Sequence, residues 1–461
     1  MGSDRQDRLE RFLCAATAFL PNRLSTAEAV CRHHANGVTL VAPEPPSAVV
    51  WPETTEEVAH IVRLAGEHAI PLIAFGGGTS LEGHVNAPQG GVSVDLSRMD
   101  AVLAVRPDDL DCTVQAGITL ERLNAELRAT GLFFPVDPGS GLATLGGMAS
   151  TRASGTTTVR YGSMRDNVIS LTAVLASGSI IRTARRARKS AAGYDLTHLL
   201  VGAEGTLGII TELTLKLHGV PDTVMCALAG FDSLDGACRA STLAIQAGLA
   251  VARIELLDCK QIQCVNAASG LAMAERPTLF VEFHGSAPAC RADFETFTEI
   301  ARDEGGHDLA SATSEDERRR LWKARHDALW SVKTMWPGRQ VIVTDIAVPL
   351  SALAACVSET AADIAASNLI APIVGHVGDG NFHAIVAVDP DDGDERQRVE
   401  AFLQRLVARA HAVDGTATGE HGIGQGKKAY MAAEHGPAID AMRAIKGALD
   451  PLGILNPGKI F

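Results

Sequence analysis

The pattern of hydrophobic and polar positions changes character near Pro221. Before this residue, short apolar runs of strand-forming residues are separated by turns that contain Gly, Pro or Asp. The first half of the chain is therefore expected to be rich in sheet. We expect strands there at 49–52, 70–75, 91–96, 101–105, 112–116, 169–175 and 206–217, and helices at 54–66 and 119–130.

Beyond Pro221, segments rich in Ala and Leu at helical spacing alternate with apolar strands. This alternation indicates an α/β or α+β second domain. An amphipathic helix precedes the first half, and a glycine-rich loop and a helix follow the second. The chain thus divides into four parts, 1–45, 46–221, 222–410 and 411–461. In the third part the expected helices are 233–247, 287–304 and 351–366, and the expected strands are 279–283, 341–348 and 373–376.

The composition is that of an ordinary globular protein. The 461 residues are 46% hydrophobic and 21% charged, enough for two or three domains with a large core. A net charge of −13 argues against nucleic-acid binding, which needs a basic face. No apolar run approaches a membrane span in length, and the N-terminal residues carry no signal-peptide pattern. The nine cysteines are scattered and form no CxxC pair, so we expect a reducing, cytoplasmic compartment.

The segment GHVGDGNFH at 375–383 carries the clearest chemistry. Its Asp-Gly pair is a favoured two-residue hairpin turn, which predicts that His376 faces His383. Directly opposed Cβ atoms on an antiparallel pair lie roughly 5 Å apart, so two imidazoles can bind one ion. Glu420 would add a carboxylate and His421 a base, which together are typical of a catalytic metal site. The alternative is two ordinary histidines beside a tight turn. The Glu-His pair at 420–421, in a separate glycine-rich loop, counts against this alternative.

Four clusters of Gly, Ser and Thr lie in the first half of the chain, at 75–83, 137–140, 145–168 and 202–208. The first, FGGGTSLEG, offers consecutive backbone N–H groups and hydroxyls, which suits a pyrophosphate. It is neither a Walker A loop nor a GxGxxG motif at the start of a Rossmann helix. The set suggests one extended polar ligand, although surface turns often have the same composition.

These clusters resemble the segments of the FAD-binding fold shared by the vanillyl-alcohol oxidase and p-cresol methylhydroxylase flavoproteins. The C-terminal half resembles the FAD-linked 2-hydroxy-acid dehydrogenases of that superfamily. That family contains the D-lactate dehydrogenases of cytochrome type, the flavin subunit of glycolate oxidase and the D-2-hydroxyglutarate dehydrogenases. The resemblance runs from about residue 46 to Phe461 and includes RARKSAAGYDLTHLLVGAEGTLGIITE, WKARHDALW, TDIAVPLS, GHVGDGNFH, GEHGIGQGK and LNPGKIF.

The resemblance implies an α+β fold. After an N-terminal helical segment, a two-subdomain FAD-binding domain of the p-cresol methylhydroxylase type would span 46–221. An α/β substrate (cap) domain with the metal hairpin would span 222–410, and a C-terminal helical segment, 411–461, would return to the flavin. Some relatives attach the flavin to a histidine, but their motif differs from LEGH around His84, so we expect non-covalent FAD.

Residues that match the family's motifs are the expected FAD contacts, although backbone turns explain many of these glycines equally well. The pyrophosphate would lie against Gly76, Gly77, Gly78, Thr79, Ser80 and Gly83. The isoalloxazine and ribityl region would be lined by Pro138, Gly139, Gly146, Gly147, Ser150, Ser154, Gly155, Tyr161 and Gly162. The adenine side would be lined by Glu204, Gly205 and Ile210, and Asn456 would return towards the flavin.

The resemblance also implies a metal and a reaction. His376, His383 and Glu420 match the family's metal ligands, and this donor set suits Zn²⁺ and Mn²⁺ equally. A small D-2-hydroxy acid, with D-lactate favoured, would be oxidised to the 2-keto acid. Hydride would pass to flavin N5, and electrons onward to a cytochrome, a quinone or another electron-transfer protein.

Three residues match the substrate-facing positions of the family. Arg325 would bind the substrate carboxylate, which a guanidinium fork suits. His421 would accept the hydroxyl proton, and Asn381 would face the substrate. An exposed helix charge is the alternative interpretation of Arg325.

Other functions stay open. A D-2-hydroxyglutarate or glycolate dehydrogenase would differ only in substrate, and the former typically has a lysine in the segment where this chain has Thr344. A non-redox enzyme resembling the ether-lipid synthases would bind FAD without oxidising a substrate, and a metal hydrolase would use the two histidines and the carboxylate without flavin. The basic run 182–189 is expected to be a solvated loop. Docking to an electron carrier or to the inner face of a membrane is its alternative role.

Overall fold

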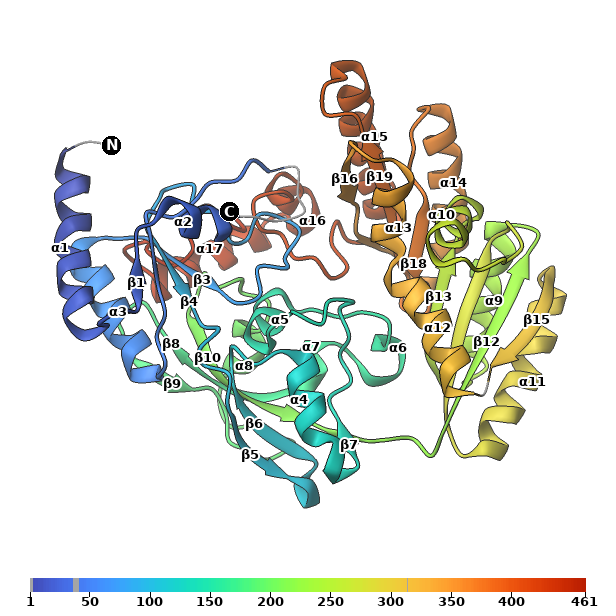
Figure 1. The fold of residues 1–461 in the computed structure, drawn as a ribbon, viewed down its shortest axis with the longest axis horizontal. Coiled ribbons are helices and arrows are strands. Elements are labelled where there is room, and N and C mark those ends of the chain that lie inside the picture. Colours follow the sequence, from blue (N-terminus) through green and yellow to red (C-terminus); the bar gives the residue numbers. More distant parts are fainter. Residues whose placement is uncertain (1–2, 36–40, 313) are drawn as a thin grey trace. The chain divides into compact units, whose positions relative to one another are not determined.

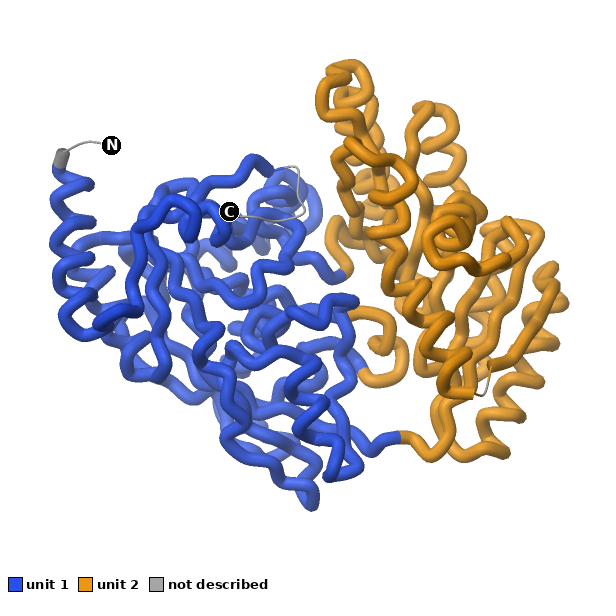
Figure 2. The backbone as a smooth tube through the Cα atoms, viewed as in Figure 1, with its two compact units in different colours: residues 1–154, 162–220, 420–461 blue, residues 155–161, 221–419 orange. Residues whose placement is uncertain are grey.

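The structure is a computed structural model that describes residues 3–35, 41–312 and 314–461. It contains two compact units (Figure 2). Unit 1 comprises Met1–Ser154, Gly162–Val220 and Glu420–Phe461, and unit 2 comprises Gly155–Tyr161 and Pro221–Gly419. The expected mixture of helix and sheet is confirmed. Part of the expected N-terminal loop, 36–40, lies outside the described residues.

Unit 1 contains short strands and helices, most of them near their expected positions. Its helices are α1 (Ser3–Phe19), α2 (Glu28–His33), α3 (Thr55–His68), α4 (Leu120–Leu127), α5 (Leu145–Thr151), α7 (Met164–Asn167), α8 (Leu196–Leu200), α16 (Met431–His435) and α17 (Ala438–Leu449). Its strands are β1 (Leu24–Ser25), β2 (Ala48–Val50), β3 (Leu72–Phe75), β4 (Val92–Asp95), β5 (Val102–Arg106), β6 (Asp111–Gln115), β7 (Leu132–Phe133), β8 (Val168–Val174), β9 (Ile180–Arg182), β10 (Ile209–Lys216) and β11 (His218–Gly219).

Two sheets organise unit 1 (Figure 1). One has the strand order β1-β2-β4-β3, in which β4 pairs in parallel with both β2 and β3. The other is antiparallel, with the order β5-β6-β10-β8-β9. Helix α3 begins after Thr54, whose side chain accepts a hydrogen bond from the Glu57 N–H, and it packs against β8 and β10. A single apolar core joins the two sheets and α3.

The C-terminal tail returns to the edge of the first sheet. Leu455 bridges Leu72 of β3 in parallel, and the Leu72 N–H donates to the Ile454 carbonyl at 2.7 Å. The Asn456 N–H donates in turn to the Leu72 carbonyl at 2.8 Å. The tail therefore lies beside the strand whose last residue, Phe75, leads into the triple-glycine loop.

Unit 2 contains longer elements. Its helices are α6 (Thr158–Tyr161), α9 (Leu234–Gln246), α10 (Cys259–Ser269), α11 (Ala287–Asp303), α12 (Glu315–His326), α13 (Ala328–Met335), α14 (Leu350–Ala366) and α15 (Gly393–His411). Its strands are β12 (Thr223–Phe231), β13 (Val251–Leu257), β14 (Thr278–Gly285), β15 (Gly306–Ala312), β16 (Gln340–Val343), β17 (Ile346–Ala347), β18 (Ile373–His376) and β19 (Asn381–Val388).

An eight-stranded antiparallel sheet forms the centre of unit 2, with the order β15-β12-β14-β13-β18-β19-β16 and with β17 paired to β19 (Figure 1). Phe280 of β14 packs against Trp322 of α12, whereas Phe283 packs against Phe297 of α11. Side chains an odd number of residues apart on a strand point to opposite faces, so α11 and α12 cover opposite faces of the sheet. Helices α10 and α13 share the core of the α12 face.

The register of the β18–β19 hairpin differs from the prediction. His376 pairs with Asn381 rather than with His383, because the loop comprises four residues, 377–380, instead of the Asp-Gly pair alone. The carbonyl of the last loop residue accepts the Val348 N–H at 3.0 Å, which holds that residue against a neighbouring segment and out of a two-residue turn. The two histidines are therefore diagonal neighbours on one face of the hairpin, a spacing at which long side chains still meet.

The expected strand 341–348 is interrupted at Thr344. Its N–H still donates to the Ala384 carbonyl at 3.1 Å, but its hydroxyl, rather than its carbonyl, accepts the Ala384 N–H at 2.8 Å, so the backbone ladder ends there. The released Thr344 carbonyl accepts a hydrogen bond from Nδ1 of His383 at 2.8 Å. The interruption of the strand thus orients one of the two hairpin histidines.

Candidate functional site

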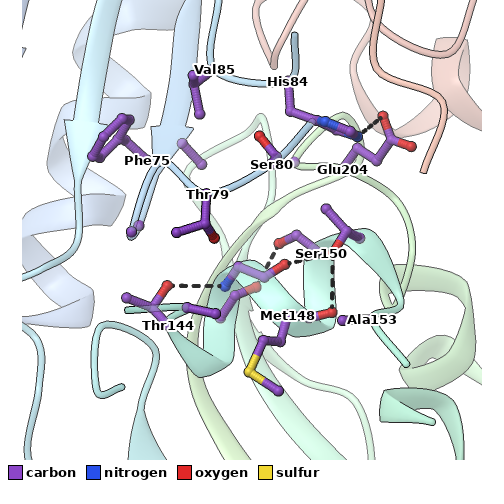
Figure 3. Close-up of a pocket in the computed structure, with 18 of the residues that line it drawn as sticks. Phe75, Thr79, Ser80, His84, Val85, Thr144, Met148, Ser150, Ala153 and Glu204 are labelled. Carbon is purple, nitrogen blue, oxygen red and sulfur yellow. Dashed lines mark hydrogen bonds and ion pairs between the residues drawn. The ribbon is translucent and has the colours of Figure 1, made fainter. Parts of the chain in front are cut away.

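One pocket of unit 1 gathers most of the residues expected to bind FAD (Figure 3). Its lining comes from the loop after β3, the segment around α5, the loop before β10 and the start of the C-terminal segment. Glu420 and His421 line the same pocket. The expected FAD contacts in this lining are Gly76, Gly77, Gly78, Thr79, Ser80, Pro138, Gly146, Gly147, Ser150, Ser154, Glu204, Gly205, Ile210 and Asn456.

The triple-glycine loop has the features of an anion cradle. Within the described part of the chain, the backbone N–H groups of residues 76–80 donate no hydrogen bond, and the buried Ser80 hydroxyl has no partner. A Cβ at Gly76 would lie 2.2 Å from Thr144 Oγ1, and a Cβ at Gly77 would lie 2.3 Å from the Leu142 carbonyl oxygen. The loop therefore needs glycine for its packing and presents a run of donors that phosphate oxygens would satisfy.

The segment around α5 lines the pocket in a different way. Its N–H groups are already used, since Gly146 donates to the Ala116 carbonyl at 2.8 Å and Gly147 donates to the N-cap hydroxyl of Thr144 at 3.3 Å. The Ser150 hydroxyl donates to the Gly146 carbonyl at 2.8 Å. This segment supplies surface to the pocket rather than backbone donors at these positions.

Five of the expected FAD contacts lie outside the lining. Gly83, Gly139 and Gly162 belong to unit 1, and each has a positive φ that favours glycine without any ligand. Gly155 and Tyr161 belong to unit 2. There the Tyr161 hydroxyl is hydrogen-bonded to Nδ1 of a buried histidine of β14 at 2.7 Å.

The loop that follows His421 is held by a buried carboxylate. Glu204 Oε1 accepts the Ile423 N–H at 2.6 Å, and Oε2 accepts the Gly424 N–H at 2.8 Å. His84 Nε2 lies 3.1 Å from Oε2, a contact drawn in Figure 3. Burial raises the pKa of the Glu204 carboxyl, but the His84 ring and the two N–H groups more than offset this, so the pKa lies below its ordinary value. Glu204, expected on the adenine side, thus uses its carboxylate to hold the loop that follows His421.

A second acidic residue lies beside His421. Nδ1 of His421 is 4.0 Å from Glu82 Oε1, and Lys427 Nζ is 3.5 Å from the same oxygen. A Cβ at Gly426 would lie 2.2 Å from Glu82 Oε2, so a side chain at this position would displace the carboxylate. Glu420, the first residue of the last segment of unit 1, accepts a hydrogen bond from the Ser154 hydroxyl at 3.0 Å.

Asn456 is also committed to the protein. Its Nδ2 donates to the Glu204 carbonyl at 2.7 Å, and its Oδ1 accepts from Lys459 Nζ at 3.2 Å. The Lys459 ammonium, which also donates to the Asn86 carbonyl at 2.7 Å, is buried, and burial lowers its pKa to about 8. The tail motif LNPGKIF therefore stabilises the wall of the pocket.

In unit 2 the structure brings His376 and His383 together. Their ring centroids are 5.4 Å apart at an interplanar angle of 82°, and a ligand nitrogen of each lies within 4.8 Å of the other. Nδ1 of His376 is 2.7 Å from Glu255 Oε1, and Nδ1 of His383 is 2.8 Å from the Thr344 carbonyl. Both partners only accept hydrogen bonds, so each neutral ring carries its proton on Nδ1 and its lone pair on Nε2. Two rings oriented in this way suit a divalent metal.

Glu255 is a further candidate site residue that the sequence analysis missed. Its carboxylate is fully buried and also accepts hydrogen bonds from Nε and Nη2 of Arg325, at 3.0 and 2.6 Å. Burial raises the pKa of the Glu255 carboxyl, but His376 and Arg325 together lower it below its ordinary value. The only signal in the sequence is one acidic residue inside the run VARIELL, which is otherwise apolar except for Arg253 and where an unpaired carboxylate would be costly.

Asn381, at the start of β19, and Asp345, between β16 and β17, form a second polar cluster in unit 2. Asn381 Nδ2 donates to Asp345 Oδ1 at 2.8 Å and to the Ile346 carbonyl at 2.7 Å, so the amide orientation follows from two acceptors. Its Oδ1 has no hydrogen-bond partner among the described residues. The other Asp345 oxygen accepts from the Thr418 hydroxyl at 2.8 Å, and His383 Nδ1 lies 3.8 Å from Asp345 Oδ1. These contacts hold the Asn381 side chain in one orientation and leave its Oδ1 as an available acceptor.

Part of the basic run 182–189 is bound to other residues of unit 1. Arg186 forms an ion pair with Asp111 at 2.9 Å, and Arg188 donates to the Asp109 carbonyl at 3.2 Å. Tyr194, just beyond the run, is 96% exposed. None of the helices that the structure describes is long and apolar enough to cross a membrane.

Two family models match the chain. A FAD binding domain matches residues 46–184, and the C-terminal domain of FAD linked oxidases matches residues 220–460. Together they cover both the glycine clusters and the histidine hairpin.

Similar proteins extend this match. The chain is 48% identical over 442 residues to a probable mitochondrial D-lactate dehydrogenase of Danio rerio, which covers 95% of this chain and 89% of that protein. It is 44% identical to the mitochondrial D-lactate dehydrogenase (cytochrome) of Arabidopsis thaliana over 90% of this chain and 73% of that protein. The crystal structure of p-cresol methylhydroxylase with substrate bound is similar with a TM-score of 0.82 at 17% identity, over 99% of this chain and 97% of the other. This last likeness shows the fold.

Proposed function

The chain belongs to the family of FAD-linked D-lactate dehydrogenases and glycolate oxidase flavin subunits, and from that premise we propose that it oxidises a small D-2-hydroxy acid, D-lactate in preference, to the 2-keto acid. It is a FAD-dependent oxidoreductase. One observation supports this choice of substrate class. The two hairpin histidines both have Nδ1 engaged by a protein acceptor, and the buried Arg325 guanidinium belongs to the same unit.

FAD would occupy the pocket of unit 1. The N–H groups of residues 76–80 and the Ser80 hydroxyl would bind the pyrophosphate, and the remaining lining residues would contact the rest of the cofactor. When bound, FAD supplies a hydride acceptor at N5. The His84 ring is engaged by Glu204, which supports non-covalent attachment of the cofactor.

A divalent metal, Zn²⁺ or Mn²⁺, would be held by His376, His383 and Glu420. Such an ion, when bound, is a Lewis acid that lowers the pKa of a coordinated hydroxyl. The Nε2 lone pairs of the two histidines support this assignment, and Glu420 follows from the family motif GEHGIGQGK. Two imidazoles and one carboxylate do not favour one of the two metals over the other.

The substrate would be held and deprotonated by residues of this chain. Arg325 would bind the carboxylate of the hydroxy acid, and Asn381 would offer its Oδ1 as an acceptor for a substrate hydrogen. His421 would take the hydroxyl proton as a general base. Thr344 supplies no second cation, which favours a monocarboxylate such as D-lactate or glycolate over D-2-hydroxyglutarate.

The electron acceptor would be a cytochrome, a quinone or an electron-transfer protein. The word cytochrome in the name of the Arabidopsis thaliana relative supports the first of these. We propose a cytoplasmic enzyme with peripheral contact to the inner face of a membrane, through the part of the 182–189 run that is not engaged by Asp109 and Asp111.

The test is an anaerobic spectrum of the purified, metal-supplied protein. Addition of D-lactate should bleach the flavin band near 450 nm, whereas L-lactate should leave it unchanged. D-2-hydroxyglutarate and glycolate, added in parallel, test the alternative substrates. A flavin band that none of these acids changes would refute the proposed oxidation and favour a non-redox enzyme.

A further inference from the structure

The carboxylate of Glu255 is the meeting point of two functional side chains of unit 2. It lies near the middle of β13 and is 0% exposed. One of its oxygens accepts from His376 Nδ1 at 2.7 Å, and the other accepts from Nε and Nη2 of Arg325 at 3.0 and 2.6 Å. A proposed metal ligand and the proposed substrate-binding arginine are thus held by one carboxyl group.

The packing of the strand gives no reason for an acid at this position. Phe280, which pairs with Glu255 across the sheet, and Leu257, on the same face of β13, are apolar and buried. A buried carboxylate without partners is unfavourable by several kcal/mol, and a buried ion pair is often no more stable than a hydrophobic residue of similar volume. The presence of Glu255 is therefore explained by what it holds rather than by stability.

The geometry connects its two partners. Both oxygens belong to one planar group, so a rotation that breaks the bond to His376 also displaces the Arg325 guanidinium. The first bond fixes the proton of the imidazole on Nδ1 and leaves the lone pair on Nε2. The second bond fixes the plane and direction of the guanidinium, whose remaining N–H groups are then oriented by the same carboxylate.

We propose that Glu255 is a positioning residue that orients the metal ligand and the substrate-binding arginine together, so that metal affinity and the KM for the hydroxy acid depend on one side chain. This inference rests on the proposed function. It predicts a behaviour that an ordinary structural ion pair would not have. Unit 2 contains such a pair for comparison, because the buried Glu395 carboxylate accepts two bonds from Arg339 Nη1, each at 2.8 Å, and forms no hydrogen bond or ion pair with any described histidine.

The test replaces Glu255 by glutamine. Glu255→Gln keeps the shape of the side chain, but its amide oxygen can accept from only one partner while its NH₂ group faces the other donor. In the flavin-containing protein stripped of metal, we expect the affinity for Mn²⁺ to fall about 10- to 100-fold, as for other residues that orient metal ligands. At saturating Mn²⁺ we expect a raised KM for D-lactate, with the flavin content unchanged. The Mn²⁺ affinity is measured by competition with a chromophoric chelator, and KM with an artificial dye as acceptor.

Two further variants make the result decisive. Glu395→Gln should lower the melting temperature but leave Mn²⁺ affinity and KM as in the wild type. Glu255→Asp retains the charge on a shorter side chain, should weaken both quantities, and serves in place of Glu255→Gln if that variant does not fold.

The outcomes separate this inference from the proposed function. Variants of Glu255 that bind Mn²⁺ and D-lactate like the wild type would overturn the positioning role, and a change in only one of the two quantities would overturn the coupling. If the wild type itself binds no Mn²⁺ and its flavin does not react with D-lactate, the proposed function fails instead.

Discussion

Replacement of Glu204 by glutamine tests the clamp on the loop that carries His421. In the structure the Glu204 carboxylate is 5% exposed and accepts the N–H groups of Ile423 and Gly424, with His84 3.1 Å away. In Glu204→Gln the amide oxygen keeps one of these bonds, and the NH₂ group is left against the other N–H. A buried unsatisfied donor costs about 1–3 kcal/mol, and the loss of charge weakens the remaining bond by about 1 kcal/mol. We expect the free energy of unfolding of unit 1 to fall by about 3 kcal/mol.

Calorimetry should detect this change as a shift of one transition. A loss of about 3 kcal/mol in a unit of this size lowers the melting temperature by roughly 6–12 °C. Because Glu204 lines the pocket, the scans are run at saturating FAD, so that a shift caused by lost cofactor is excluded. Glu126→Gln is the matched control. That carboxylate is 49% exposed in a helical ion pair with Arg122, so its replacement should change stability by less than about 0.5 kcal/mol.

The pH dependence gives an independent check of the same clamp. The pKa of Glu204 lies below its ordinary value of 4.5, so the folded state favours the ionised form. The clamp therefore contributes fully above pH 4.5, and its contribution is lost as the pH falls through the lower pKa of the folded state. The stability difference between wild type and Glu204→Gln should be constant from pH 6 to 8 and shrink on acidification below about 4.5. An unchanged transition, or a difference that grows at acid pH, would refute the reasoning.

Three further predictions concern the pocket, the substrate and the metal. Gly77→Ala, whose new Cβ would lie 2.3 Å from the Leu142 carbonyl oxygen, should lose most of its FAD on gel filtration, as read from the ratio of absorbance at 450 and 280 nm. Gly447→Ala, in open space on α17, should retain it. Arg325→Lys should raise the KM for D-lactate about 10- to 100-fold, because an ammonium cannot form the two hydrogen bonds of the guanidinium fork and the loss is about 1.5–3 kcal/mol. A KM equal to that of the wild type in a dye assay would contradict the role of Arg325. Removal of metal with a chelator should abolish bleaching by D-lactate while FAD stays bound, and Mn²⁺ or Zn²⁺ should restore it; bleaching that survives removal of all metal would exclude the metal from the reaction.

Local patterns in the sequence were sufficient for most elements of the fold. The helix expected at 54–66 is α3 at Thr55–His68, and the strand expected at 112–116 is β6 at Asp111–Gln115. In both cases the periodicity lies within the element itself, and the N-cap residue of α3, Thr54, directly precedes the helix. The glycine clusters could be recognised for the same reason, because a run of N–H groups without bulky side chains is a local property.

Contacts between distant segments account for what the sequence did not reveal. The hairpin loop is longer than its Asp-Gly pair suggests because the Val348 N–H, outside the hairpin, binds the last loop carbonyl. The strand at 341–348 breaks because the Thr344 hydroxyl replaces a backbone acceptor. No spacing rule contains such partners, since each is brought into place only by the folded sheet.

The buried acids of this chain indicate how more residues of the candidate site could be predicted from sequence. Glu204 and Glu255 are both nearly or fully inaccessible, and each holds residues of the site rather than another part of the core. Glu255 meets partners 70 and 121 positions away, so no local motif could have identified them. Its own position could have been suspected, because a lone carboxylate in an apolar strand must be paired to be tolerated. An acid whose surroundings predict burial therefore points to a cation, an imidazole or a set of N–H groups that the fold must supply. In this chain those partners are the histidine proposed as a metal ligand, the arginine proposed to bind the substrate, and the loop that follows the proposed general base. The cost of burying an acid therefore identifies the side chains that hold these residues in place.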